Sequence, residues 1–138
     1  MASDERAAQE HQQAIDARTL IEAYRHAFES RDLPACVRFF AEDAVLRFLF
    51  ATYEGRAAIE TWHKERFAAD VHLLRLDGMA EEGDTVVVQA VATSRRLRLF
   101  RIDQVKGTAT FRIEQGLFKE ATLSPRKGAP SHLDWQFR

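Results

Sequence analysis

Cysteine is nearly missing from this chain of 138 residues, and long apolar runs are missing altogether. With Cys36 alone, no intramolecular disulfide can form and one chain cannot build a cysteine-based zinc cluster, so we infer a reducing compartment. No run approaches the ~18 apolar residues of a membrane span, and the polar start of the chain lacks the core of a signal peptide. These absences predict a cytoplasmic protein that does not enter the membrane.

An excess of charge of either sign is missing as well. Lys and Arg number 20 and Asp and Glu 21, for a net charge of −1 and a pI near 6.5. Such a balance argues against nucleic acid or an anionic membrane and favours a neutral small molecule or a protein as partner. The one basic cluster, R-R-L-R-L-F-R at 95–101, is interpreted as the solvated end of a strand or a dimer rim. The five scattered histidines show no metal-ligand spacing, so we predict neither metal nor cofactor.

What the chain does contain is 46% hydrophobic residues in periodic patterns, enough for the core of one domain over 13–124. Residues 1–12 are interpreted as a polar leader. Apolar residues at helical spacing predict a helix over Gln13–Ser30, and a short second helix follows Asp32 and carries Phe40 inward. A third helix starts at Gly55 and covers a sheet with one face, formed by Ile59, Trp62, His63, Arg66 and Phe67.

Between these helices, the run Ala44–Phe50 predicts a strand with Leu46, Phe48 and Phe50 on one face. Turn signals later in the chain divide it into four further strands of an antiparallel meander, near 71–81, 84–100, 102–114 and 117–124. The last segment, 125–138, is predicted to be a tail that docks through Trp135 and Phe137.

This order of elements resembles the nuclear transport factor 2-like superfamily and, within it, the SnoaL-like group of small bacterial proteins. The resemblance covers roughly 19–123. It depends on five sequence segments, which occur in this order: Y-R-H-A-F-E-S-R-D-L-P-A-C, F-F-A-E-D-A-V, Y-E-G-R-A-A-I, E-G-D-T-V-V-V and G-T-A-T-F-R-I-E-Q-G.

The resemblance implies an α+β, cone-shaped fold, in which a curved antiparallel sheet packs on three helices of the N-terminal half around an apolar cavity. It also implies a homodimer that pairs through the sheet face. Because the superfamily includes isomerases, cyclases, epoxide hydrolases and binding proteins, the function has to be argued from the site.

This chain lacks the catalytic carboxylate residues that the best-known activities of this superfamily need. Ketosteroid isomerases use a carboxylate base and an oxyanion-binding aspartic acid, whose positions correspond to Phe48 and Ala109. Limonene-type epoxide hydrolases use an Asp–Arg–Asp set, and Ala90 and Ala92 stand where its Arg and Asp are expected. The last strand, at 121–124, also lacks the aspartate of SnoaL-type cyclases. Both the isomerase and the epoxide hydrolase activity are therefore disfavoured.

Tyr24 and His63 are the candidates for catalysis among the polar residues able to reach the cavity. The full set of such residues is Tyr24, Arg47, Tyr53, His63, Arg66, His72 and Gln89. His63 beside a carboxylate would act as a general base, and the alternative is a helix histidine bonded to a backbone carbonyl. Tyr24 could bond a ligand oxygen or a partner in the core. Arg66 could clamp an anionic ligand or form a salt bridge at the helix end.

Aromatic side chains dominate the predicted wall of the cavity, so a small hydrophobic molecule is the expected ligand. The predicted wall consists of Phe28, Phe40, Leu46, Phe48, Phe50, Trp62, Phe67 and Phe111, with Arg66 as an additional ligand contact. Three functions stay open at this point. They are binding of a small molecule, a cyclase, isomerase or hydratase reaction on a polyketide- or terpenoid-like compound, and a non-catalytic dimerisation or interaction domain.

Overall fold

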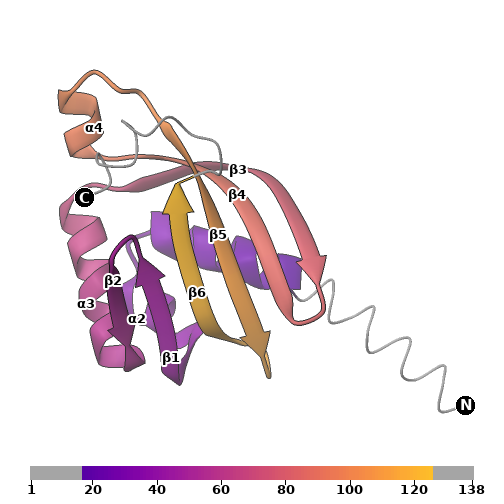
Figure 1. Cartoon of the computed structure of the whole chain (residues 1–138). Helices are drawn as coiled ribbons and strands as arrows, with labels where there is room; N and C mark the ends of the chain where they lie inside the picture. The colour runs from indigo at the N-terminus through magenta and orange to yellow at the C-terminus, as the bar shows by residue number, and fades with distance from the viewer. Residues whose placement is uncertain (1–16, 126–138) are drawn as a thin grey trace, which may run out of the picture.

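A curved sheet with helices packed against one of its faces makes up the part of the chain described by this computed structural model, residues 17–125 (Figure 1). The predicted leader, residues 13–16 of the first predicted helix, and Trp135 and Phe137 of the predicted tail lie outside the described residues.

Six strands form the sheet in the order β2-β1-β6-β5-β4-β3. All neighbours are antiparallel except β1 and β6, which run parallel. The strands are β1 (Phe40–Phe48), β2 (Ala51–Glu54), β3 (His72–Glu82), β4 (Thr85–Thr93), β5 (Val105–Glu114) and β6 (Leu117–Pro125). The helices are the N-terminal helix (residues 17–29), α2 (Leu33–Arg38), α3 (Gly55–Ala68) and α4 (Arg95–Leu99). The α+β fold expected from the sequence is confirmed.

The N-terminal helix buries the apolar stripe that its sequence predicts, including Ile21, Tyr24 and Phe28. It ends in a tight turn at Arg31, whose φ is 58°. Asp32 then caps α2 by accepting a hydrogen bond from the backbone N–H of Ala35 at 3.2 Å. The predicted joint between the first two helices is therefore confirmed.

Helix α3 begins at Gly55, where φ is 85°, a value that glycine adopts without strain. Its buried residues are Ile59, Trp62 and His63, which lie on the face predicted from their spacing. This face packs against the sheet and closes one side of the core.

The first strand differs from its prediction at both ends. Phe40 begins β1 instead of ending the second helix, because it pairs with Phe118 on β6 and the Phe118 N–H donates to the carbonyl of Phe39 at 2.8 Å. At the other end β1 stops at Phe48. The chain reverses through Leu49, whose φ is 57°, and returns as β2, a strand that the sequence analysis missed.

The predicted strand over 84–100 is also wrong in its second half. Strand β4 ends at Thr93, and the hydroxyl of Ser94 caps α4 by accepting from the N–H of Leu97 at 3.3 Å. Leu97 is buried, so packing stabilises this short helix where alternation alone suggested a strand. The next strand, β5, accordingly begins at Val105 and not at 102.

Polar contacts fix the N-terminal helix on the start of β3. Glu29 accepts from the N–H of Leu73 at 2.6 Å, and Arg25 donates to the carbonyls of Leu73 and Leu74 at 3.1 and 2.8 Å. These three hydrogen bonds connect the helix directly to the strand. No helix in the described part of the chain is long and apolar enough to cross a membrane.

Candidate functional site

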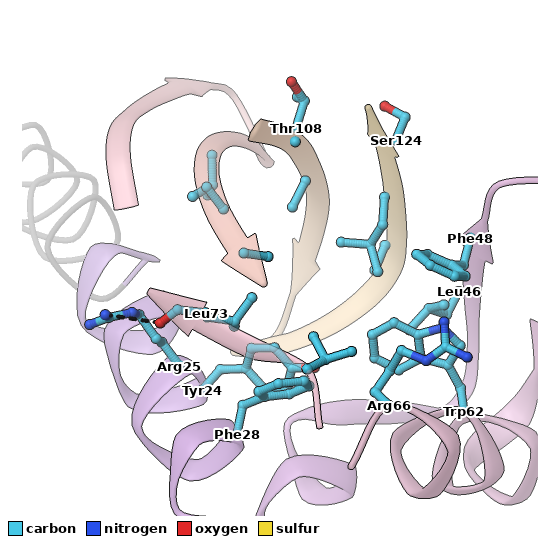
Figure 2. A pocket seen from close by; sticks show the side chains of 18 of the residues that line it. Tyr24, Arg25, Phe28, Leu46, Phe48, Trp62, Arg66, Leu73, Thr108 and Ser124 are labelled. Carbon is cyan, nitrogen blue, oxygen red and sulfur yellow. Dashed lines mark hydrogen bonds between the residues drawn. The ribbon is translucent and has the colours of Figure 1, made fainter. Parts of the chain in front are cut away.

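A pocket of about 320 Å³ lies between the N-terminal helix, α3 and the inner face of the sheet (Figure 2). Tyr24 and Phe28 line one side of it, and Phe48, Trp62 and Arg66 line the opposite side. The lining extends along β4, β5 and β6 to α4, and the surface that it presents is almost entirely apolar.

Most residues predicted for the cavity wall do line this pocket. They are Phe28, Phe40, Leu46, Phe48, Trp62 and Phe111, together with Arg66 and the proposed catalytic Tyr24. They come from the N-terminal helix, β1, α3 and β5, which the fold brings together. Of the seven polar candidates, Tyr24 and Arg66 reach the pocket.

Phe50 and Phe67 do not line the pocket, and their predicted placement is wrong. Phe50 follows the reversal at Leu49 and is 84% exposed, so it no longer shares the face of Leu46 and Phe48. Phe67 turns toward the N-terminal helix, where its ring lies 5.2 Å from that of Phe28 and 5.1 Å from the guanidinium carbon of Arg31. It therefore supports the wall from behind.

His63 lies behind Tyr24 and is completely buried. Its Nδ1 lies 2.8 Å from the carbonyl oxygen of Ile59, and its Nε2 lies 2.7 Å from the Tyr24 hydroxyl. Burial lowers the pKa of His63 to about 4, so the imidazole is neutral near pH 7. Because a carbonyl can only accept, Nδ1 carries the proton, and Nε2 accepts the hydrogen bond that Tyr24 donates.

Of the two roles left open for His63, the bond to a backbone carbonyl is the one formed, because the two groups bonded to its ring are Tyr24 and Ile59 and neither is a carboxylate. Burial also raises the pKa of Tyr24 well above its usual value, so its hydroxyl stays protonated. The one proton of that hydroxyl is already donated to His63. Toward the pocket, the hydroxyl of Tyr24 can therefore offer only an acceptor lone pair.

Aromatic rings enclose Tyr24 on several sides, with centroid separations from 5.5 to 6.3 Å. The rings belong to Phe28, Phe39, Phe40, Phe111 and Phe118. Most meet Tyr24 at steep angles, which is the favourable edge-to-face geometry. The tyrosine–histidine pair is thus held rigidly within the core.

Arg66 projects from the last turn of α3 against the faces of two aromatic rings. Its guanidinium carbon lies 4.6 Å from the ring centroid of Phe48 and 5.7 Å from that of Trp62. In the described part of the chain its side chain makes no ion pair or hydrogen bond, so the expected helix-end salt bridge is not formed. Its Nε and the Nε1 of Trp62 are buried N–H groups without a partner there. Burial lowers the pKa of Arg66, which remains charged.

Small or apolar side chains occupy the positions that the resemblance assigns to the catalytic acids and the arginine of other enzymes. Phe48, Ala90, Ala92 and Ala109 all line the pocket. Among the described residues, the lining contains no Asp, Glu or His, while it contains three arginines, Arg25, Arg66 and Arg96. The described residues also hold no group of three or more His, Cys, Asp or Glu able to bind a metal ion.

His72 belongs to a polar cluster outside the pocket lining. Its Nδ1 lies 3.0 Å from Glu29 and its Nε2 lies 2.9 Å from Asp70, which also pairs with Arg98. The pKa of the Asp70 carboxyl is lowered, first by its hydrogen bond to His72. Since Glu29 lies on the N-terminal helix, Asp70 follows α3, His72 begins β3 and Arg98 lies on α4, these contacts connect four elements at one end of the pocket.

Several pocket residues were missed, some of them because they lie in the mispredicted half of the strand over 84–100. Ser94, Arg96 and Leu97 line the pocket next to α4, and Thr108 and Ser124 lie at the far end from Tyr24 (Figure 2). A serine followed by arginine and leucine, all compatible with helix, was the available signal for α4. Gln89, in contrast, accepts from Thr108 at 3.1 Å and does not line the pocket.

Comparison with known proteins identifies a SnoaL-like domain over residues 21–121. A candidate polyketide cyclase from Sinorhizobium meliloti is similar in structure, with a TM-score of 0.68 and 25% identity over 77% of this chain and 94% of that one. A second candidate polyketide cyclase, from Xanthomonas campestris pv. campestris, has a TM-score of 0.70 and 19% identity over 89% of this chain and 97% of that one.

A candidate ketosteroid isomerase from Kribbella flavida gives a TM-score of 0.68 and 18% identity over 83% of this chain and 81% of that one. No curated protein matches the sequence.

Proposed function

Because the chain belongs to the family of SnoaL-like domains, whose members use one fold for several activities, we propose from its own pocket that it binds a small hydrophobic molecule. The apolar character of the lining carries this proposal. In the described residues, no lining side chain can serve as a carboxylate or imidazole base, and the proton of Tyr24 is engaged by His63. Such a pocket favours retention of a ligand over proton transfer.

The volume of the pocket supports the same function. At about 320 Å³ it falls near the lower end of the ~300–1,000 Å³ range of small-molecule sites. A core filled by its own side chains would leave only voids of about the size of a water molecule. The size fits a compact ligand of a few fused rings or an acyl chain.

Binding can be followed through Trp62, because it lines the pocket. In a Trp135→Phe variant Trp62 is the only tryptophan, and titration with steroids, flavonoids and fatty acids should change its fluorescence. Ala90→Leu should abolish the change by filling the pocket. Ala80→Leu adds the same bulk at an exposed position of β3 and should leave the change intact. Equal responses of both leucine variants would exclude this pocket as the site.

A cyclase-like acid–base reaction is the second candidate, favoured by the 2.7 Å hydrogen bond between Tyr24 and His63 at the pocket wall. The likeness to candidate polyketide cyclases supports it as well. Turnover of polyketide- or terpenoid-like compounds should then be lost in both Tyr24→Phe and His63→Ala, together with a bell-shaped pH profile. Turnover that survives in both variants would rule out this pair.

Two sequence-based expectations remain proposals. We propose that two copies pair through the outer face of the sheet, which sedimentation at increasing concentration would test by a rise in mass toward that of a dimer. The proposed cytoplasmic location would be tested by fractionation of cells that express the protein. A purely monomeric species or recovery with the membrane would contradict the respective proposal.

A further inference from the structure

The chemical class of the ligand follows from the unpaired charge at one end of the pocket. Arg66 lines the pocket, yet its guanidinium forms no ion pair or hydrogen bond with the described residues. Of its three nitrogens, only Nε is both buried and without a partner. The two terminal nitrogens also lack a described partner but are not fully buried, so they are accessible to a ligand. Removing a charge from water without a counter-charge is costly, and an anionic ligand would offset that cost.

The guanidinium is also held in place. Trp62 and Arg66 are four residues apart on α3 and therefore share one face of the helix. The ring of Trp62, together with that of Phe48 on β1, lies against the guanidinium (Figure 2). Stacking on two aromatic faces restricts the side chain, so less conformational entropy is lost when it binds a ligand.

The charged side chains of the whole lining also favour a negatively charged ligand. Arg25, Arg66 and Arg96 line the pocket, and among the described residues no acidic side chain does. Arg25 donates to the carbonyls of Leu73 and Leu74, which are neutral and leave its positive charge uncompensated by those contacts. Low-dielectric walls with charge of one sign concentrate the opposite charge.

We propose that the pocket binds a hydrophobic monocarboxylic acid, with its carboxylate on the terminal nitrogens of Arg66 and its apolar body between Tyr24, Phe28 and Trp62. The planar fork of arginine matches a carboxylate in two parallel hydrogen bonds. A monoanion suits a pocket whose surface is mostly apolar better than a doubly charged phosphate, which costs more to desolvate. This inference rests on the proposed function of ligand binding.

Three naphthalene probes of the same ring size separate the alternatives. They are 2-naphthoic acid, its neutral amide 2-naphthamide, and 2-naphthyl phosphate, each titrated calorimetrically at pH 7. The acid should bind wild-type protein about 10- to 100-fold more tightly than the amide, as expected for hydrogen bonds to a charged group. Arg66→Gln should remove this preference by weakening binding of the acid far more than binding of the amide.

Control variants distinguish a specific contact from general charge. Arg75→Gln removes an exposed arginine that pairs with Asp77 outside the pocket, and it should keep the full preference for the acid. Arg66→Lys should retain part of it, since the ammonium keeps the charge but loses the fork. An unchanged thermal midpoint of Arg66→Gln would show that the variant is folded.

The outcomes are separable. Equal affinity of acid and amide for the wild-type protein would overturn the carboxylate anchor while leaving hydrophobic binding intact. Tighter binding of the phosphate would assign the site to phosphate esters and overturn the proposal. Absence of binding by all three probes and by the panel of steroids, flavonoids and fatty acids would instead refute the proposed function itself.

Discussion

Mild acid should destabilise this protein through protonation of His63. Buried among Tyr24, Trp62 and Phe40, the ring accepts at Nε2 from Tyr24 and donates at Nδ1 to Ile59. Protonation of Nε2 would place a second donor against the Tyr24 hydroxyl and a charge in an apolar core. The folded state therefore resists protonation of His63, whereas the unfolded chain does not.

The size of the effect follows from the two pKa values of this side chain. Its pKa is about 4 in the folded protein against an ordinary value of 6.5. Above pH 6.5 the residue is neutral in both states and costs nothing. As the pH falls from 6.5 to 4, the unfolded state binds the extra proton, so stability declines across this window. At ~1.36 kcal/mol per pKa unit, a difference of about 2.5 lowers the free energy of unfolding by about 3 kcal/mol.

Urea denaturation followed by circular dichroism at pH 7.0, 5.5 and 4.5 would measure this loss. His63→Gln keeps an acceptor for Tyr24 but does not titrate, so its stability should fall much less over the same range. His26→Gln removes an exposed histidine from the N-terminal helix and should keep the wild-type slope. If wild type and His63→Gln lost stability in parallel, the reasoning about a neutral buried imidazole would be refuted.

Further predictions concern single side chains. Tyr24→Phe should lower the free energy of unfolding by about 1–3 kcal/mol because Nε2 of His63 loses its donor. Tyr53→Phe, at a half-buried tyrosine with no hydrogen bond to described residues, should stay within about 0.5 kcal/mol, and equal losses in urea denaturation would contradict this. Arg66→Met should leave stability unchanged or raise it, because an unpaired half-buried charge becomes apolar; a loss above about 1 kcal/mol would indicate a partner. Burial raises the pKa of Cys36 to about 12, so a thiol reagent at pH 8 should label native protein roughly 1,000-fold more slowly than urea-unfolded protein, and rapid native labelling would contradict that burial.

Local patterns in the chain determined the parts of the fold that depend on neighbours in sequence. The stripe that contains Tyr24 and Phe28 and the face that contains Ile59 and Trp62 were predictable because apolar side chains three and four residues apart must share one side of a helix. The cap at Asp32 was predictable for the same local reason.

Segments whose conformation depends on distant partners were mispredicted. Phe40 belongs to β1 because β6, almost 80 residues later, supplies its partner Phe118. Phe50 leaves the wall because the chain reverses at Leu49 to form β2. In 95–101, burial of Leu97 selects a short helix over an alternating strand.

The chemistry of the site shows the same division. Sequence alone determined that Tyr24, Trp62 and Arg66 would be presented from two amphipathic helices, while the resemblance to a known superfamily implied that alanine and phenylalanine stand where some of its enzymes carry acids. Only the tertiary structure decided that His63 bonds Tyr24, 39 residues away, and that Arg66 meets rings instead of a carboxylate. Periodicity specifies which face of an element turns inward, but hydrogen-bond and ion partners depend on how separate elements pack, which no local pattern contains.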